Sequence, residues 1–572
     1  MKNKIIYGLL ALGLMTSVSS CSESYLDTVP QSSVSLPTLF SDPDGAQNAI
    51  NGLGKLMCSQ YMSTQGQNGE GTMQLYFGDY PGMALQKCDY TGWMNTINGK
   101  YHSNNSNGNM AFSWHYPYRL IANANIIINN IPKDPKEEDK ADWGYIKAQA
   151  LCYRAHSYLY LVQLYSRRWG YRNGESRGVV IRDDEDYGVD PEYTITPKAA
   201  SSLKEVYEYI YADLEEAINL FQASTQSRPS SKRWLPAESV AHAIYARAAL
   251  TREDWSTASA QAKLACKGAS LMTAEQYEEG FNTPNNEWIW AAFNSEEQDV
   301  YYYSFFAYVG SNSKSSSCRT NPVAISRQLV EKIPANDSRL HVYAIPTEDE
   351  LPKYPEQVSG AGKVTQTDDK NLEKLKAAAE KDPEKSGPAY ENALQCNSFY
   401  NRIWGDPFYA GRLYRTANGV TTLYYYLCTK FLAQNDLGVG QLCLYRMAEM
   451  LYIQAEAEYM LGNEATARQV LESAVAPYQD NYTCTLTGDE LLEEILTYRE
   501  FDLCGEGHSW FDIKRRGASF ERKSWLDGGS WNESFAIEGG PNYENDMTFV
   551  YPQIETNYNQ LVQTTESSTW PN

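Results

Sequence analysis

The chain has 572 residues, of which 42% are hydrophobic and 13% aromatic, and its net charge is −22. This apolar content supplies a large core and excludes a disordered chain, and the acidic balance without a basic cluster excludes nucleic acid as a ligand. Tyrosine dominates the aromatic residues, with 44 against 16 phenylalanines. Because tyrosine joins a flat apolar ring to a hydroxyl, this content favours surfaces that bind polar ligands.

The first 21 residues have the pattern of a signal peptide. Two lysines precede an apolar run from residue 5 to residue 15, and small residues lead to Cys21. We predict that residues 1–20 are a signal peptide and that residues 21–572 form a single body. Small residues before a cysteine also resemble a lipoprotein-processing site, where acylation of Cys21 would anchor the protein to a membrane. The alternative is a plain signal peptide with a chance cysteine.

The other cysteines and the histidines show no metal-binding or redox spacing. Ten cysteines are scattered without a CxxC pair, and no two of the six histidines lie four residues apart. We predict buried free thiols, with disulfides as the alternative, and no cofactor or metal. The run Asp183–Asp186 offers enough carboxylates for calcium, but it lacks EF-hand spacing, and a solvated acidic loop is the favoured interpretation.

A glycine-, asparagine- and tyrosine-rich segment follows a first predicted helix at residues 35–57. It has many turn residues and little periodicity, which predicts a surface loop, and such loops often carry function. Within it, residues 79–98 combine flat rings with hydrogen-bonding side chains, the two groups that a sugar requires. The candidate ligand residues are Tyr80, Tyr90 and Trp93 for stacking, and Asp79 and Asn95 for hydroxyls. The alternative for Trp93 is ordinary core packing.

Apolar stripes at helical spacing begin near residue 118. They recur through residues 148–162, 203–221 and 237–262, which predicts amphipathic helices joined as hairpins. Such hairpins are typical of tetratricopeptide-like repeats, and they must stack because one hairpin cannot bury its apolar face alone. The repeat helices are placed within about residues 118–268 and 444–517, and loop-rich ligand-binding regions within about 58–117 and 271–443.

The helical pattern breaks between residues 271 and 442. Trp288–Trp290 and Tyr301–Tyr303 lie in short strand-like runs, and the aromatic segment from residue 397 to residue 442 also predicts strands. The charged stretch 347–393 predicts a surface excursion with one short helix at residues 372–379. Weaker ligand candidates in this region are Trp290, Tyr308 and Trp404.

The stretch from residue 444 to residue 517 has the clearest helical pattern. Gly462 ends its first helix and Asn463 is the predicted cap of the second, while Thr487 and Glu490 have the spacing of a capping box that opens a third. Acidic and basic residues alternate with Trp510 and Phe511 near its end. We interpret these charges as a paired internal network rather than a catalytic site.

The same stretch contains Arg446, Glu449, Ala455, Glu456, Ala457, Arg499, Glu500, Leu503, Glu506, Gly507, Trp510, Phe511, Asp512, Lys514, Arg515 and Gly517. With these residues it resembles the SusD-like (RagB/SusD) family of outer-membrane nutrient-binding lipoproteins. Asp502 stands where that family usually has glutamate, and Ser509 where it usually has arginine, which puts one structural ion pair in doubt. Weaker resemblances lie at residues 25–30, 213–214, 255 and 337–339.

The resemblance implies a mostly α fold, in which a tetratricopeptide-like helical-repeat scaffold carries an irregular, loop-rich ligand-binding half with short strands. It further implies a glycan-binding lipoprotein of the outer membrane, facing the cell exterior, that delivers oligosaccharides to a SusC-like TonB-dependent transporter. The alternatives are an oligopeptide-binding protein of the RagB type and a helical-repeat scaffold with protein partners only. The sequence holds no GxSxG, HExxH, P-loop or GxGxxG motif, and we expect no enzymatic activity.

Overall fold

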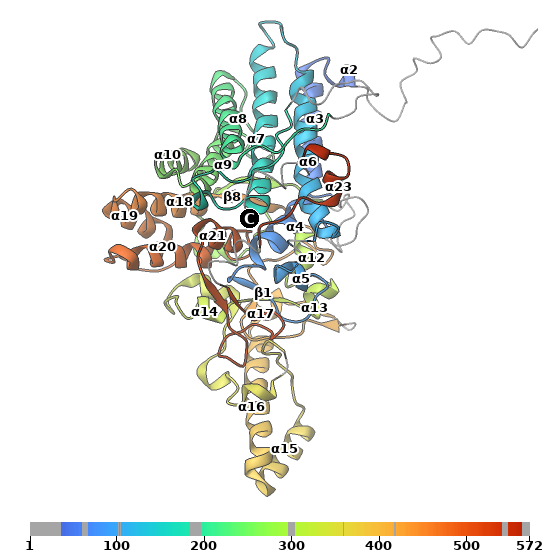
Figure 1. Cartoon of the computed structure of the whole chain (residues 1–572). Helices are drawn as coiled ribbons and strands as arrows, with labels where there is room; N and C mark the ends of the chain where they lie inside the picture. Colours follow the sequence, from blue (N-terminus) through green and yellow to red (C-terminus); the bar gives the residue numbers. More distant parts are fainter. Residues whose placement is uncertain are drawn as a thin grey trace, which may run out of the picture.

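The computed structural model describes residues 36–59, 67–100, 102, 104–183, 196–295, 304–358, 360–416, 419–539 and 547–562. Antiparallel helices pack one after another along its upper part in Figure 1. Their apolar stripes face one another as the sequence predicts; in α8, for example, Val206, Ile210 and Leu214 are buried. These helices are α2 (Leu36–Leu39), α3 (Pro43–Leu56), α6 (Gly108–Asn130), α7 (Lys140–Tyr165), α8 (Leu203–Ala223), α9 (Glu238–Thr251) and α10 (Trp255–Ala265).

The helical stack continues with a segment that is distant in the sequence. Helix α10 packs directly on α18, although residues 266–446 separate the two. Small residues at this junction, Ala258 and Ala262 on α10 and Ala455 on α18, are fully buried and allow the close approach. The predicted helical-repeat scaffold is therefore confirmed. Its later helices are α18 (Met447–Met460), α19 (Glu464–Val475), α20 (Gly488–Asp502) and α21 (Ser509–Arg516).

Short strands and helices make up the irregular half, whose largest sheet is antiparallel with strand order β1–β3–β7–β4. Leu85 of β1 pairs with Ile325 of β3, and Tyr343 of β4 pairs with Cys428 of β7. The strands are β1 (Leu85–Lys87), β2 (Trp288–Ala292), β3 (Val323–Ile325), β4 (Tyr343–Ala344), β5 (Arg415–Thr416), β6 (Gly419–Val420), β7 (Leu427–Cys428), β8 (Leu442–Arg446), β9 (Phe520–Arg522) and β10 (Ile537–Gly539).

The short helices of the irregular half lie mostly between these strands. Among them, η2 is a π-helix whose residues are all buried. No helix in the described ranges has the length and apolar character needed to cross a lipid bilayer. The remaining helices are α4 (Gly69–Thr72), η2 (Met73–Asp79), α5 (Met94–Ile97), η3 (Trp169–Tyr171), α11 (Ala274–Tyr277), α12 (Phe305–Val309), α13 (Ser316–Arg319), α14 (Arg327–Val330), η6 (Ser338–Val342), η7 (Glu348–Glu350), η8 (Pro355–Gln357), α15 (Asp369–Lys381), α16 (Pro383–Gly405), α17 (Pro407–Arg412) and α23 (Gln553–Thr556).

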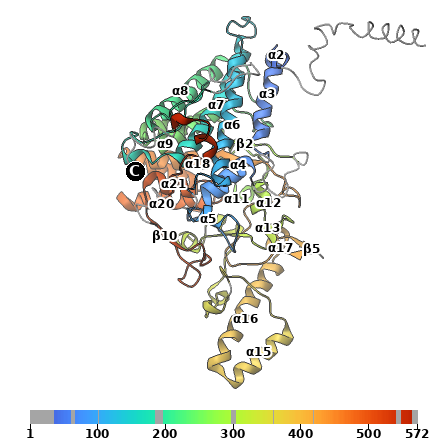
Figure 2. The same cartoon turned by 45° about the vertical axis from the view of Figure 1, so that its right-hand side comes forward.

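A helical hairpin, α15 with α16, projects from the body in both views (Figures 1 and 2). The sequence predicted a short helix at residues 372–379, which lies within α15, and strands between residues 397 and 442, where β5, β6 and β7 lie, but it missed helix α16. Helix α16 runs to Gly405, and its buried residues Ala393, Cys396, Phe399 and Ile403 follow helical spacing. The aromatic content of this segment had suggested strands, but the spacing of its buried residues decides for a helix.

Two predicted helix caps do not form. The side chain of Thr487 caps no backbone N–H, and the first turn of α20 is satisfied by a tertiary contact from Gly488 N to Glu464 Oε1 at 3.1 Å. Asn463 likewise makes no cap, and its amide donates to Glu458 Oε2 at 2.8 Å. At α20, a contact from the neighbouring helix α19 therefore replaces part of the local capping that the sequence pattern suggested.

Strands β2 and β8 pair where the chain leaves and re-enters the helical scaffold. Trp288 of β2 is the partner of Arg446, the last residue of β8. The carboxylate of Glu287, just before β2, accepts from Arg446 Nη1 at 2.7 Å and from the first turn of α18 at Ala448 N. This carboxylate thus fixes the start of β2 to the start of α18.

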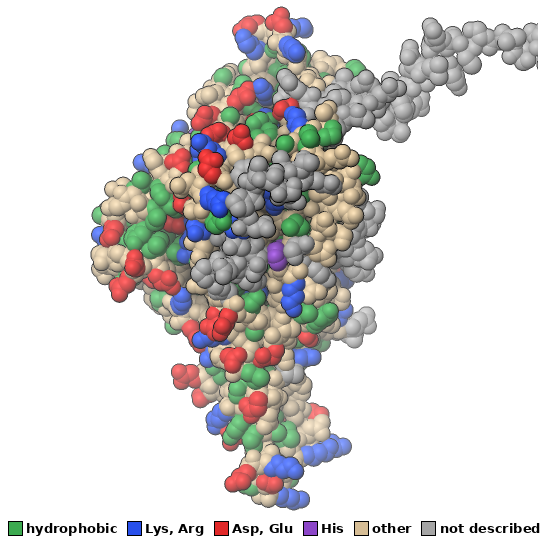
Figure 3. Space-filling model, in the orientation of Figure 1, with side chains coloured by type: hydrophobic (Ala, Val, Ile, Leu, Met, Phe, Trp, Pro, Cys, Tyr) green, Lys and Arg blue, Asp and Glu red, His purple; other side chains and the backbone are tan. Residues whose placement is uncertain are grey.

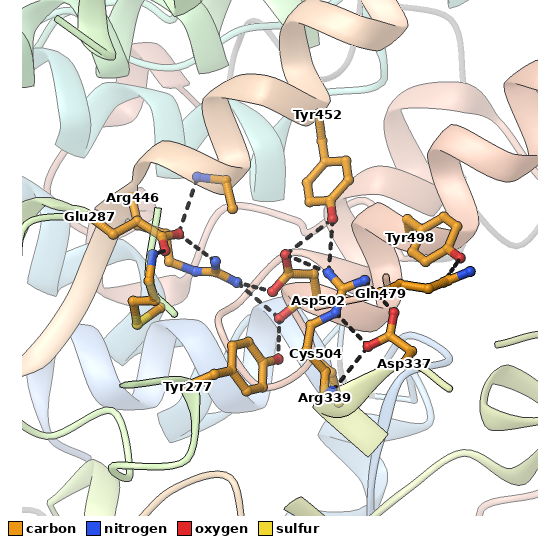
Figure 4. A network of polar contacts seen from close by, with 12 residues as sticks. Tyr277, Glu287, Asp337, Arg339, Arg446, Tyr452, Gln479, Tyr498, Asp502 and Cys504 are labelled. Atoms are coloured by element: carbon orange, nitrogen blue, oxygen red, sulfur yellow. Dashed lines mark hydrogen bonds and ion pairs between the residues drawn. The ribbon is translucent and has the colours of Figure 1, made fainter. Parts of the chain in front are cut away.

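A network of buried charges surrounds Arg446 (Figure 4). Its guanidinium contacts Glu506 Oε2 and Asp502 Oδ1, each at 2.7 Å. On the other side of Asp502, Arg339 Nη1 donates to Oδ2 at 3.0 Å. The Nε and Nη2 groups of Arg339 donate to the carboxylate of Asp337. Burial alone would raise the pKa of Asp502, but Arg446 and Arg339 lower it to about 2.

The predicted internal pairing also holds in the last helices of the scaffold. Asp512 bridges Arg499 and Arg515 at 2.7 Å each, and Arg515 forms a bidentate pair with Glu456 at 2.6 Å. Ser509 makes hydrogen bonds in place of an ion pair, because its hydroxyl donates to Glu500 at 2.8 Å. Burial raises the pKa of Glu500 above its usual value.

We expect Arg446→Met to lower the free energy of unfolding by about 3–5 kcal/mol, because the buried Glu287 loses its ion-pair partner, while Asp502 keeps only Arg339 and Glu506 keeps only Lys430. Urea titration followed by circular dichroism measures the change. The matched control is Lys332→Met, which removes an exposed ion pair with Glu493 at 2.8 Å and should change stability by less than about 1 kcal/mol. Equal losses in the two variants would contradict the structural role of the network.

Candidate functional site

The segment from β1 to α5 displays aromatic rings at the surface of the irregular half. Tyr90 is the most exposed of them, with 66% of its surface accessible. Trp93 lies three residues later, at the start of α5, and is partly buried. A solvent-facing tyrosine beside a partly covered tryptophan is a surface on which a flat ligand can stack.

The backbone of Tyr90 is held by one side chain from a distant loop. Asn321 accepts from Asp89 N at 2.8 Å through Oδ1, and its amide donates to the carbonyls of Asp89 at 2.8 Å and Tyr90 at 2.9 Å. Tyr90 N in turn donates to Asp89 Oδ1 at 2.8 Å. Four hydrogen bonds therefore fix the backbone beneath an exposed ring, which reduces the ordering that a ligand would require.

A buried lysine ties the same two loops together. Lys87, the last residue of β1, is only 2% exposed. Its ammonium donates to the carbonyls of Tyr308 at 3.1 Å and Asn321 at 3.0 Å, and to Ser317 Oγ at 3.1 Å. Burial lowers the pKa of Lys87 to about 8. The lysine thus holds the loop of Asn321 against the strand that leads to Tyr90.

Trp93 joins the surface to the core. Its ring lies 4.1 Å from the ring of Tyr76 between centroids, at 30°, and meets Phe77 edge-on at 6.5 Å. Asn95, in α5, is also partly buried, and its carbonyl accepts from Lys100 N at 2.7 Å. The two interpretations of Trp93 therefore describe two sides of the same ring, which packs inward on Tyr76 and keeps part of its surface exposed.

A second loop, residues 532–534, lies beside the end of α5. Asn98 donates to the carbonyl of Ser534 at 2.7 Å and accepts from Arg522 Nη2 at 3.2 Å. Ser534 is exposed, and its hydroxyl donates to Asn532 Oδ1 at 2.7 Å. This loop adds hydroxyl and amide groups at the edge of the aromatic segment.

Asp79 and Tyr80 lie in the core and offer no surface to a ligand. Asp79 is fully buried and accepts from Gly507 N at 2.5 Å. Gly78 and Gly82 flank it, and a Cβ at either position would collide with Gly507 or Ser509, so only glycine permits this approach. The sequence indicated a loop here, but the segment is the buried π-helix η2 and its continuation.

The three weaker candidates are scattered. Trp290 is fully buried and donates through its indole to the carbonyl of Trp234 at 3.0 Å. Tyr308 is 8% exposed and meets Tyr76 edge-on at 5.4 Å. Trp404 is partly buried on the projecting α16, under the guanidinium of Arg415 at 4.9 Å. Tyr308 supports the aromatic segment from beneath, whereas Trp290 and Trp404 belong to other parts of the fold.

Sequence reasoning missed Asn321, Lys87 and the 532–534 loop. A lone asparagine in a turn carries no pattern, and its role depends on a contact across 231 residues of sequence to Tyr90. Cys21, Asp184–Asp186 and Tyr301–Tyr303 lie outside the described residues. Within the described ranges, no three His, Cys, Asp or Glu side chains lie together as a metal site.

Two family profiles match the chain in succession. A profile described as starch-binding and associating with the outer membrane matches residues 25–250, and the profile of the SusD family matches residues 286–566. No curated protein matches the sequence at a significant level.

Solved structures with the same fold cover almost the whole chain. A SusD-like carbohydrate binding protein from Bacteroides vulgatus is 21% identical, with a TM-score of 0.65 over 93% of this chain and 98% of its own. A SusD superfamily protein from Bacteroides thetaiotaomicron is 18% identical, with a TM-score of 0.64 over 91% and 99%. Surface glycan-binding protein A from that organism, in complex with laminarihexaose, is 15% identical, with a TM-score of 0.54 over 83% and 90%.

The buried carboxyl of Asp79 should make stability fall as pH rises. Burial raises its pKa from 3.8 to about 7, against the opposing effect of the Gly507 N–H. Between these values the unfolded chain loses a proton that the folded chain keeps, so the free energy of unfolding decreases with pH. We expect Asp79→Asn to remove this decrease. The free energy of unfolding of the variant minus that of the wild type should therefore rise by about 2–4 kcal/mol from pH 4 to pH 7.

Urea titrations at several pH values measure this difference, and its slope is the test. Any pH-independent effect of an amide at residue 79 changes the stability of the variant equally at pH 4 and at pH 7, so it does not alter the slope. Parallel stability curves for wild type and Asp79→Asn would show that Asp79 does not titrate in this range.

Proposed function

We propose, from the premise that this chain belongs to the SusD family, that it is a cell-surface lipoprotein that binds glycan. It captures oligosaccharides and passes them to a SusC-like TonB-dependent transporter in the outer membrane. The observation that carries the ligand assignment is the exposed ring of Tyr90 on a backbone fixed by Asn321. The transporter and the outer-membrane location follow from the family alone.

The chemistry of the aromatic segment suits a neutral sugar. A pyranose presents a C–H face that stacks on a ring and hydroxyls that bond to side chains at the ring's edge. Tyr90 supplies the ring, with Trp93 beside it, and Asn98, Asn532 and Ser534 supply polar groups nearby. Acidic and basic side chains are interspersed over the face in Figure 3, and a neutral ligand tolerates such a surface.

Binding without cleavage is part of the proposal. Glycoside hydrolysis requires two carboxyl groups facing each other across the bond that breaks. Asp89, the carboxylate next to Tyr90, accepts from the backbone N–H of Tyr90 and so holds the loop. This structural role and the binding function of the family support a capture protein.

We expect Tyr90→Ala to weaken glycan binding by tenfold or more, because a truncated aromatic hot spot forfeits at least about 2 kcal/mol. Tyr90 is a cleaner probe than Trp93, whose removal would also expose Tyr76 and lower the melting temperature. A glycan array identifies the ligand, and calorimetry on the best binder measures the affinity. The matched control is Tyr558→Ala, which removes another exposed tyrosine, 82% accessible, outside this segment.

Three outcomes oppose this assignment. Equal losses of glycan affinity in Tyr90→Ala and Tyr558→Ala would show that the aromatic segment is not part of the binding site. Binding to a peptide library, with no glycan bound, would establish the oligopeptide alternative, for which the net charge of −22 favours basic peptides. Chromatography after incubation with the bound glycan should show no smaller products, and their steady release would indicate an enzyme.

The lipid anchor has its own test. Cys21 follows small residues at the end of the predicted signal peptide, and several acyl chains hold a protein on a membrane essentially irreversibly, at about 0.8 kcal/mol per buried CH2. We expect Cys21→Ala to move the protein from the membrane fraction to the soluble fraction, as shown by immunoblotting. Cys58→Ala serves as the control for losing a thiol. Unchanged membrane association of Cys21→Ala would exclude the anchor.

A further inference from the structure

Two adjoining hollows lie in the helical scaffold, apart from the aromatic segment. The outer hollow lies beside the C-terminal end of α7 and η3, and the inner hollow lies between α7, α9, α20 and α21. Both are lined by Gln163, Thr251, Phe511 and Arg515, so the two hollows share a wall. The room inside each is enough for only one or two water-sized groups.

Guanidinium groups dominate the inner hollow. Arg247, Arg499 and Arg515 line it, and Asp512 is the one carboxylate among its lining residues. Glu449 and Glu456 hold Arg247 and Arg515 from behind by bidentate pairs of 2.6–2.8 Å. Each of the three guanidinium groups thus has a carboxylate partner, so an additional acceptor is required only where one of their N–H groups is left unpaired.

Arg499, which lines the inner hollow, has one unsatisfied donor. Arg499 is 2% exposed, and its Nε donates to Asp512 Oδ2 at 2.7 Å. Its Nη1 is enclosed and has no hydrogen-bond partner among the described residues. An unpaired N–H of a charged group is unfavourable inside a protein by more than the roughly 1–3 kcal/mol of a neutral one. The position therefore calls for an acceptor.

His508 adds a buried imidazole to the inner hollow. It lines the inner hollow and is buried. Burial lowers its pKa well below the usual value, and the nearby charges of Arg247 and Arg499 lower it further, against the opposing effect of Asp512. The imidazole is therefore neutral at physiological pH, with one N–H left to donate.

The outer hollow places further cationic side chains beside the inner one. Arg167, Arg168 and Lys514 line it together with Trp169. Lys514 donates to the carbonyl of Gln163 at 2.7 Å, at the C-terminal end of α7. These positive side chains raise the local concentration of anions even though the whole chain is strongly negative.

We infer that the inner hollow binds one small monovalent anion, such as a halide or formate, with Arg499 Nη1 as its principal donor. The size of the inner hollow excludes a sugar ring or a peptide. The bound ion satisfies the orphan donor and links α20 and α21 to α7 and α9, whose side chains form the other walls. The site is thus a stabilising element of the scaffold and is separate from the proposed glycan site.

Bromide is the first probe. Crystals of the wild-type protein grown in bromide, with data collected at the bromine absorption edge, should show an anomalous peak within about 3.5 Å of Arg499 Nη1. A normal-scattering peak without anomalous signal would mean that water fills the hollow and would overturn the inference. This measurement does not depend on whether any variant folds.

A thermal-shift series is the second probe. Potassium bromide and potassium formate should each raise the melting temperature of the wild type, on the order of 1 °C or more, over potassium gluconate of equal ionic strength. Gluconate is too large for the inner hollow. The shift should vanish in Arg499→Lys, which keeps a charge for Asp512 but loses Nη1.

The matched control is Arg154→Lys. Arg154 forms a buried bidentate pair with Asp213, at 2.8 and 2.6 Å, and does not line either hollow. This variant should lose stability in a similar way and keep the full bromide shift. Equal shifts in wild type, Arg499→Lys and Arg154→Lys would reveal a general salt effect and refute the site.

Discussion

The ion pairs of Arg446 are the interaction on which both halves of the molecule depend. Its guanidinium forms ion pairs with Glu287, which lies where the chain leaves the helical scaffold. It also pairs with Asp502 and Glu506, which lie at the end of α20 and just after it. Desolvating these charges is unfavourable, and the arrangement is tolerated only because each group finds its partner. The start of α18, the strand pair β2–β8 and the end of α20 must therefore assemble together, which excludes alternative packings of the helices.

The same network positions the aromatic segment through a chain of contacts. Glu506 is held by Arg446 and Lys430, and the next residue, Gly507, donates its N–H to Asp79 in η2. Ser509 accepts from Met83 N at 2.8 Å, just before β1. Strand β1 ends at Lys87, whose ammonium holds the loop of Asn321. The ring of Tyr90 thus stands at the end of a rigid path that begins in the helical core.

Much of the scaffold could be predicted from the sequence, because helical stripes and paired charges are local patterns or follow from burial. The stripe of α8 and the pairing of Asp512 with Arg499 and Arg515 are examples. The candidate ligand surface could be predicted only in part. Tyr80 and Tyr90 occur in the same glycine-rich stretch, yet one is 1% and the other 66% exposed. Composition does not separate them, because their burial depends on Gly507 and Asn321, which are distant in the sequence.

Tyrosine has a different role here from the one its abundance first indicated. Many of these rings lie between helices, where the hydroxyl satisfies a buried polar group: Tyr116 donates to Glu70 at 2.7 Å, Tyr452 to Asp502 at 3.1 Å and Tyr158 to the carbonyl of Arg182 at 2.8 Å. A phenylalanine at these positions would leave acceptors unpaired. The tyrosine content thus reflects a polar core more than a wide ligand face. In the proposed glycan site, affinity would rest on few exposed rings, so the rigid backbone beneath Tyr90 would matter correspondingly more.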